Sequence, residues 1–244
     1  MEITARIEQS LIEAVEQGTS AGCPPRLAAA MRHAVFPRGA RIRPRLCLSV
    51  AVACGDDDPA LATAAAGAIE LLHCASLVHD DLPCFDDADT RRGRPSVHRA
   101  FGEPLAVLAG DALIVLAFQH IAGVVSSPAR RAQVIALVGR AVGASSGIIG
   151  GQAWECESEI DVARYHRAKT GALFAAASSV GAAASGQDPG QWRTLGETLG
   201  EAYQIADDIR DAIASEADIG KPVGRDAALG RPNSVAALGL DGAV

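Results

Sequence analysis

Two clusters of aspartates are the residues of this sequence whose type and spacing most clearly suggest chemistry. The first lies in HDDLPCFDDADTRRGRP, residues 79–95, where five carboxylates fall within ten residues and three arginines follow. These residues are Asp80, Asp81, Asp86, Asp87, Asp89, Arg91, Arg92 and Arg94. Like charges this crowded repel one another unless a cation joins them, and a hard divalent cation with oxygen ligands would relieve the repulsion. The alternative, a solvated acidic turn with a capping aspartate, is less favoured because a long apolar segment directly precedes the cluster.

The second cluster lies in EAYQIADDIRDAI, residues 201–213, and contains Asp207, Asp208 and Asp211. Asp207 and Asp211 are spaced i, i+4, so their carboxylates would point from one face of a helix. One such D-D-x-x-D is common on exposed helices and is weak evidence alone. Two clusters on apolar helices are stronger evidence, because they could face each other and hold Mg2+ ions that bridge to a diphosphate.

The segments that must position these clusters are predicted to be helices. Apolar residues continue from Ala60 to Leu82 for roughly six turns, which predicts a long, buried helix. The run Asp56-Asp57-Asp58-Pro59 before it is predicted to be a turn and N-cap, and Pro83 should end it because proline has no amide proton to donate. Further helices are predicted over 105–125, 130–149, 170–184 and 192–214. No segment alternates with period two for long enough to predict a strand, so the predicted fold class is all-α.

Composition narrows the class of protein. The 244 residues are 49% apolar and only 4% aromatic, which fits one large domain of close-packed helices. The net charge of -7 and the lack of a long basic run argue against a nucleic-acid partner. The six cysteines show no C-x-x-C or zinc-ligand spacing, and the first residues do not resemble a signal peptide. The longest uncharged stretch, Thr170–Gln187, is too short to span a bilayer, so we expect a reduced, cytoplasmic protein with no transmembrane segment.

Both aspartate clusters resemble the motifs of one known family. HDDLPCFDD resembles the first aspartate-rich motif of the trans-prenyl diphosphate synthases, and YQIADDIRD resembles the second. Further family blocks follow in the expected order: RGARIRP (38–44), HCASLVHDD (73–81), AGDAL (109–113), GGQ (150–152), KTG (169–171) and GKPVGRD (220–226). The resemblance covers the chain from about Phe36 to Leu240. It is greatest to the geranylgeranyl diphosphate synthases of bacterial carotenoid and bacteriochlorophyll pathways.

The resemblance implies a fold and an activity. The fold would be a single-domain helical bundle of the isoprenoid synthase type around a central apolar tunnel. This domain would span residues 1–244 and lack the family's last C-terminal helices. The protein would be a cytoplasmic homodimer that joins isopentenyl diphosphate to an allylic diphosphate with Mg2+, three ions when diphosphate is bound. The implied metal ligands are Asp80, Asp86 and Asp207, with Asp81, Asp208 and Asp211 binding directly or through water.

The other implied roles belong to basic and polar residues. The allylic diphosphate would be held by Arg91, Lys169 and Lys221. Isopentenyl diphosphate would be held by Arg43, His73 and Arg92, with Arg41 nearby. The reacting carbons would be surrounded by Lys169, Thr170 and Gln204. Taken singly, each basic residue could instead be a surface charge, and His73 could be a core histidine bonded to a carbonyl.

Product length is expected to depend on the helix before Asp80, which would form one wall of the tunnel. The residues expected to face the growing chain are Leu72, Ala75 and Ser76. A bulky aromatic near Ala75 would stop the chain early, as in the farnesyl-type enzymes, whereas Ala75 and Ser76 leave room. One helical turn rises about 5.4 Å, roughly one isoprene unit. We therefore expect geranylgeranyl diphosphate, C20, as product, with farnesyl diphosphate, C15, as the alternative.

Two further interpretations compete with the synthase. A class I terpene cyclase ionises the same substrates, but its second metal motif is absent after Asp207 and its pocket is usually rich in aromatic residues, of which this chain has few. A non-catalytic partner subunit of a second synthase tends to lose one aspartate-rich motif, and both are present here. One departure from the family pattern is Ala40, which stands where the G-G-K-R-x-R-P block has lysine. It removes one expected diphosphate contact.

Overall fold

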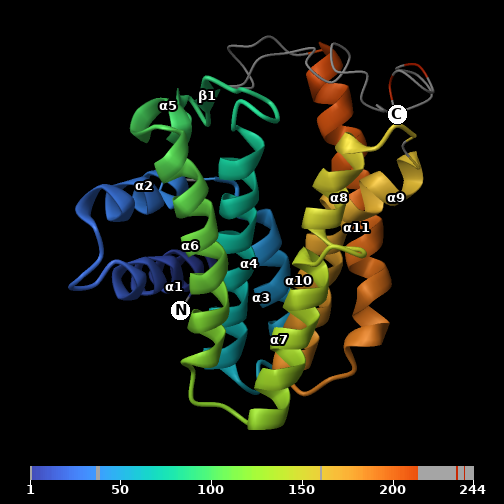
Figure 1. Ribbon diagram of the computed structural model, residues 1–244. Coiled ribbons are helices and arrows are strands. Elements are labelled where there is room, and N and C mark those ends of the chain that lie inside the picture. The colour runs from blue at the N-terminus through green and yellow to red at the C-terminus, as the bar shows by residue number, and fades with distance from the viewer. Residues whose placement is uncertain (1, 37–38, 160, 214–234, 236–238, 240–244) are drawn as a thin grey trace.

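The protein is a bundle of helices (Figure 1). The computed structural model describes residues 2–36, 39–159, 161–213, 235 and 239. Its α-helices are α1 (Ile3–Gly18), α2 (Pro25–Val35), α3 (Ile42–Ala53), α4 (Pro59–Asp80), α5 (Val97–Phe101), α6 (Glu103–Ala122), α7 (Pro128–Val142), α8 (Ile148–Ala153), α9 (Val162–His166), α10 (Ala172–Ala184) and α11 (Pro189–Ile213). A 3-10 turn, η1 (Trp154–Cys156), follows α8, and a π-helical turn, η2 (Arg167–Gly171), joins α9 to α10. The predicted all-α fold class is confirmed.

Helix α4 is the centre of the bundle, with α6, α3, α10 and α1 packed around it. Its N-cap is Asp58, whose side chain accepts a hydrogen bond from the Leu61 amide at 3.0 Å, as predicted. Leu71 and Leu72 are at most 1% exposed, and burying each such side chain stabilises the fold by about 1.5–3 kcal/mol. The helix ends at Asp80, so the first aspartate cluster lies where α4 leaves the core, near β1 in Figure 1.

One predicted helix is two helices in the structure. The sequence pattern predicted a single helix over residues 130–149, but α7 ends at Val142 and α8 begins at Ile148. The chain turns between them because Gly143 is extended, with ψ of 171°. A Cβ on Gly150 would lie 2.0 Å from the Ala144 carbonyl oxygen, so this tight turn depends on glycine.

The prediction that the chain has no strand is wrong at one place. Strands β1 (Thr90–Arg91) and β2 (Arg94–Pro95) form a two-stranded antiparallel hairpin directly after the first aspartate cluster. Its turn residues, Arg92 and Gly93, have φ of 52° and 72°, and a tight two-residue hairpin requires positive φ at both positions. Strands this short contain no period-two pattern, so the sequence could not predict them.

Helices α4 and α6 are long and apolar enough to cross a membrane, judged by length and composition alone. Of the apolar window in each, 78% of α4 and 39% of α6 is buried inside the protein. A core helix of a globular protein passes the same test, and α4 has that position here. The outward face of α6 is different, since Leu108 and Val115 are about half exposed.

Small residues let α10 approach α3 closely. A Cβ on Gly181 of α10 would lie 2.2 Å from the Cys47 carbonyl oxygen and 3.1 Å from the Ala51 amide nitrogen, both on α3. By contrast, a Cβ on Gly139 of α7 would meet no atom within 4 Å. The two helical glycines therefore differ only in what surrounds them.

We predict opposite effects of the same substitution at these two positions. Gly181→Ala should destabilise the protein by about 1–3 kcal/mol through overpacking, because backbone atoms of α3 must shift. Gly139→Ala should stabilise it by about 0.5–1 kcal/mol, since alanine loses less backbone entropy in a helix. For a chain of this size each kcal/mol is about 2–4 °C in melting temperature, which thermal unfolding followed by circular dichroism would measure. A Gly181→Ala protein as stable as the wild type would contradict this packing.

Candidate active site

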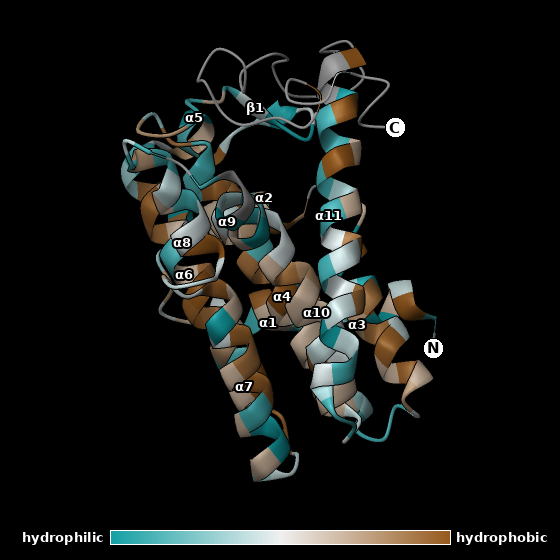
Figure 2. Cartoon of the chain, turned by 90° about the vertical axis from the view of Figure 1, so that its right-hand side faces the viewer, coloured by the Kyte–Doolittle hydropathy of each residue, from teal (hydrophilic) through white to brown (hydrophobic). Residues whose placement is uncertain are grey.

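A single cavity of about 950 Å3 contains most of the residues that the sequence singled out. It lies between α4 and α6 on one side and α8, η2, α10 and α11 on the other, and side chains from all of them line it. Apolar residues of α4, α6, α7 and α10 surround part of it: Leu72, Ile114, Val142 and Leu173. Charged residues such as Asp80, Lys169 and Asp207 line another part, while α4, which lies behind α11 in Figure 2, is largely hydrophobic. The cavity therefore combines a polar region with an apolar one.

The two aspartate clusters meet at the polar region. Asp80 and Asp86 from the first cluster and Asp207 from the second all line the cavity. Burial raises the pKa of Asp80, an effect that Lys169 opposes and Asp86 adds to. The Oδ1 atom of Asp80 is buried and has no hydrogen-bond partner among the described residues. A carboxylate in this state favours a nearby cation, and oxygen donors suit Mg2+.

The remaining carboxylates of the first cluster bind arginines. Asp81 is 2% exposed, and its Oδ1 accepts a hydrogen bond from Arg91 Nε at 2.9 Å. Burial raises the pKa of Asp81, and Arg91 opposes that rise. Asp87 and Asp89 lie 3.1 Å and 2.6 Å from nitrogens of Arg99 on α5. These three aspartates therefore secure the loop and the hairpin, while Asp80 and Asp86 face the cavity.

The second cluster divides in a similar way. Asp208 is 3% exposed and accepts a hydrogen bond from Gln204 Nε2 at 2.8 Å, while Asp207 faces the cavity. The hydroxyl of Thr170 donates to Gln204 Oε1, so two of the three residues expected near the reacting carbons are in contact. Both line the cavity.

The side chain of Asp211 and the whole of Lys221 lie outside the described residues. Within the described part of the chain, no three acidic, histidine or cysteine side chains lie close enough to hold an ion without further ligands.

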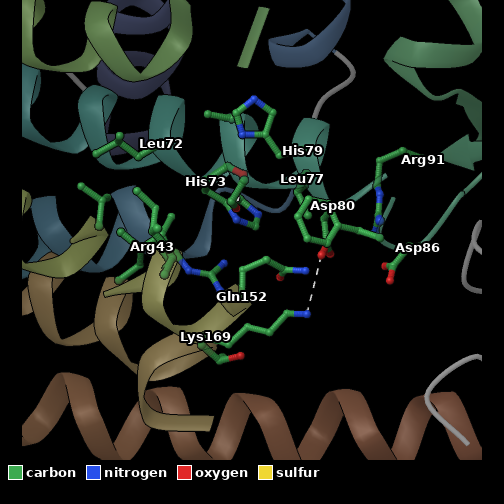
Figure 3. Close-up of a pocket in the computed structure, with 18 of the residues that line it drawn as sticks. Arg43, Leu72, His73, Leu77, His79, Asp80, Asp86, Arg91, Gln152 and Lys169 are labelled. Carbon is green, nitrogen blue, oxygen red and sulfur yellow. Dashed lines mark hydrogen bonds and ion pairs between the residues drawn. The ribbon is translucent and has the colours of Figure 1, made fainter. Parts of the chain in front are cut away.

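Lys169 and Arg91 bring positive charge to the carboxylates from opposite sides. Lys169 Nζ lies 3.6 Å from Asp80 Oδ1, and Figure 3 shows the lysine reaching toward that aspartate. Lys169 belongs to the π-helical turn η2, and such turns are frequent at functional sites. Arg91 is placed by the hairpin and by Asp81. Both cations line the cavity.

Arg43 and His73 form a second polar group at the cavity wall (Figure 3). The Arg43 guanidinium lies over the rings of Phe174 and Tyr203, with centroids 4.6 Å and 5.6 Å away, and its buried Nε has no hydrogen-bond partner within the described residues. Burial lowers the pKa of Arg43. Burial and the nearby Arg43 and Arg92 hold the pKa of His73 well below its usual value, so the imidazole is neutral at pH 7. An anion bound between these groups would satisfy them.

Arg41 differs from the other predicted cations. Its nitrogens contact Glu70 Oε1 at 2.7 Å, Glu8 Oε1 at 3.0 Å and the Val35 carbonyl at 2.9 Å, and the residue is only 5% exposed. Burial alone would lower the pKa of Arg41, but Glu70 and Glu8 raise it overall. Glu70 also lies 3.9 Å from Arg92. The Arg41 guanidinium therefore stabilises the wall of the cavity by binding Glu8, Glu70 and the Val35 carbonyl.

The three residues expected to set product length, Leu72, Ala75 and Ser76, all line the cavity from α4. The sequence interpretation gave no role to Gln152, although it lies in the quoted GGQ block, and it missed Glu155 altogether. The structure places Gln152 on the cavity wall beside Lys169 (Figure 3). Glu155 accepts hydrogen bonds from both. Its sequence signals were a position three residues after Gln152 and a place at the start of a run of alternating acidic residues.

Comparisons with known proteins identify the family of this chain. The Polyprenyl synthetase family profile matches residues 24–243. Geranylgeranyl diphosphate synthases of Rhodobacter capsulatus and Cereibacter sphaeroides are 53% and 52% identical over 244 residues, which is all of this chain and 84% and 85% of those proteins. A Helicobacter pylori geranyltransferase, solved with magnesium and isoprenyl diphosphate, superposes with a TM-score of 0.80 at 28% identity, covering 100% of this chain and 86% of that one.

Fold and site together define an isoprenoid diphosphate synthase of the all-α type. The chain belongs to the polyprenyl synthetase family and is a prenyltransferase. The family resemblance drawn from the two aspartate-rich motifs is thereby confirmed.

Proposed function

We propose that this protein condenses isopentenyl diphosphate with allylic diphosphates to give geranylgeranyl diphosphate, C20. The observation that carries the proposal is one cavity with two different regions. Carboxylates and cations share its polar region, where Asp80 lies beside Lys169 and Asp207 lines the same cavity, and the apolar wall of α4 continues from there through Ala75 and Leu72. The names of the two bacterial relatives at 53% and 52% identity support the same product.

Magnesium fits the polar region. Asp80, Asp86 and Asp207 would hold the ions, three of them with a bound diphosphate, because their oxygens line the cavity and the buried Asp80 Oδ1 lacks a hydrogen bond. When bound, the metal supplies positive charge that stabilises the leaving diphosphate. Asp81 and Asp208 contribute by holding Arg91 and Gln204 in place.

The protein's own residues bind and separate the two substrates. Lys169, Arg91 and Lys221 hold the allylic diphosphate, and Asp211 is a further magnesium ligand, directly or through water. Arg43, His73 and Arg92 hold isopentenyl diphosphate at the neighbouring wall, which places its double bond beside the allylic carbon. The cationic Lys169 and Arg91 stabilise the negative charge that develops on the allylic diphosphate as its C–O bond breaks, so they lower the barrier.

The bond changes balance without a side-chain base. The allylic C–O bond breaks and leaves its electron pair on diphosphate. The double bond of isopentenyl diphosphate forms the new C–C bond, and the proton then lost from carbon goes to the released diphosphate. Thr170 and Gln204 line the space around the reacting carbons, and the apolar wall excludes water that would otherwise capture the cation.

Two alternatives to a geranylgeranyl diphosphate synthase would each give a different experimental result. Farnesyl diphosphate would be the product if the cavity near Ala75 were closed, and a partner subunit would bind magnesium and diphosphate without turnover. A terpene cyclase is disfavoured because, among described residues, the aromatic side chains lining the cavity are Phe85, Tyr165 and Tyr203, and Tyr203 contacts Arg43.

Product analysis tests the proposed function. Purified protein with Mg2+, isopentenyl diphosphate and each of the C5, C10 and C15 allylic diphosphates should yield a C20 product, read by mass spectrometry. EDTA should abolish the product, and excess Mg2+ should restore it. No product from folded protein, with magnesium and diphosphate binding intact, would favour the partner-subunit alternative.

A bulky residue at position 75 should shorten the product. Ala75→Tyr places a phenol ring on the cavity wall of α4, so we predict a shift from C20 to C15 because one isoprene unit needs about one helical turn of space. Ala60→Tyr, on the exposed first turn of the same helix, is the matched control and should leave C20 unchanged. An Ala75→Tyr enzyme that still makes C20 would show that position 75 does not limit chain length.

We also propose that the protein is a cytoplasmic homodimer. The outward face of α6 supports the dimer, since Leu108 and Val115 lie seven residues apart on one side of an apolar helix and are 51% and 56% exposed. A second copy packed on this face would remove both side chains from water, which stabilises association.

Introducing charge on that face should separate the subunits. The wild type should sediment at twice the chain mass, and Val115→Glu should shift it toward the monomer because the carboxylate would be buried. Val125→Glu is the matched control, since Val125 lies beyond the end of α6 and is 95% exposed. If Val115→Glu remains as dimeric as Val125→Glu, the interface lies elsewhere.

A further inference from the structure

Glu155 lies behind the cavity wall and binds three residues that shape the polar region. Its Oε1 accepts hydrogen bonds from the Tyr165 hydroxyl at 2.8 Å and from Lys169 Nζ. Its Oε2 accepts one from Gln152 Nε2 at 3.1 Å. Tyr165, Lys169 and Gln152 all line the cavity, whereas Glu155 does not. Both oxygens of this carboxylate are therefore used by residues that face the site.

The Lys169 side chain depends on its contact with Glu155 for its orientation. A lysine side chain has four rotatable bonds, and ordering it costs up to about 2 kcal/mol of conformational entropy. Lys169 Nζ is held between Glu155 and Asp80, and it also lies 5.6 Å from the centre of the Tyr165 ring. Three contacts thus direct the ammonium toward the carboxylate that ends α4.

The backbone around this cluster is equally constrained. A Cβ on Gly151 would lie 2.4 Å from the Lys169 amide nitrogen and 2.6 Å from its Cα, so α8 packs directly on the π-helical turn η2. Glu155 follows α8 in the 3-10 turn η1. Gly151 lets the backbone of Lys169 lie against α8, and the Glu155 carboxylate then holds the Lys169 side chain in place.

We propose that Glu155 is a positioning residue that holds Lys169 in the orientation required to bind the allylic diphosphate. The inference rests on the proposed function, because Lys169 binds diphosphate only in that scheme. Glu155 acts through Lys169 and touches no substrate, since it lies outside the cavity lining. Tyr165 and Gln152 assist by keeping the carboxylate in one rotamer.

Glu155→Gln tests the proposal because it keeps the side chain's size and removes its charge. We expect kcat/KM for the allylic diphosphate to fall about 10- to 100-fold, as a displacement near 1 Å can do. The KM for isopentenyl diphosphate should change less than about two-fold, because that substrate is held by Arg43, His73 and Arg92 at the neighbouring wall. Glu157→Gln is the matched control: Glu157 is exposed two residues away and should leave both constants unchanged. Glu155→Asp should recover part of the loss.

A double-mutant cycle separates positioning from a general structural role. Tyr165→Phe alone should lower the allylic kcat/KM about three-fold, since it removes one hydrogen bond to Glu155. In the Glu155→Gln background the same change should have almost no further effect, because the two residues act through one contact. Equal effects of Tyr165→Phe in both backgrounds would overturn the proposal. So would an allylic constant for Glu155→Gln equal to that of Glu157→Gln.

Failure of the inference and failure of the proposed function give different results. If the wild type makes no prenyl product, the proposed function fails. Binding of inorganic diphosphate with Mg2+, measured by calorimetry, then still tests Glu155, and Glu155→Gln should bind at least ten-fold more weakly than Glu157→Gln. Equal binding by these two variants, at equal melting temperature, would overturn the positioning role.

Discussion

Carboxylates buried beside cations at one end of an apolar cavity are the arrangement on which the rest of this structure depends. Asp80 ends α4, the central helix of the bundle, and burial raises its pKa. A group in that state is stable as an anion only if positive charge is close. Lys169 supplies such charge at 3.6 Å, and Arg91 is brought near by its hydrogen bond to Asp81. The small elements of the fold can be understood from this requirement.

The short irregular segments are the ones that bring positive charge close to the buried carboxylates. The hairpin after the aspartates directs Arg91 back toward Asp81, and Arg99 on α5 secures Asp87 and Asp89. On the opposite wall, the close approach of Gly151 to η2 brings Lys169 within reach of Glu155. The long helices supply stability and the apolar wall, while turns of two to five residues orient the charged groups.

The chemistry proposed here needs both kinds of surface in one cavity. Charge that develops on a leaving diphosphate is stabilised by fixed cations, and the carbocation formed beside it survives only where water is excluded. Arg43 illustrates how the two surfaces meet. Its guanidinium rests on Phe174 and Tyr203, so an apolar platform holds a cation whose Nε still has no hydrogen bond within the described residues.

The sequence alone determined the all-α class, the long helix α4 with its cap and its end before Pro83, and the two clusters from which the aspartates of the cavity come. These features follow from local propensity and from unusual charge density, which are visible in one dimension. Only the tertiary structure decided which aspartates meet: Asp80, Asp86 and Asp207 share one cavity, while Asp81 and Asp208 bind neighbouring side chains. It also revealed the role of Glu155, since the alternating acidic residues Glu155, Glu157, Glu159 and Asp161 give no reason to single out the first of them. Such roles depend on contacts between distant segments, and spacing along the chain does not encode them.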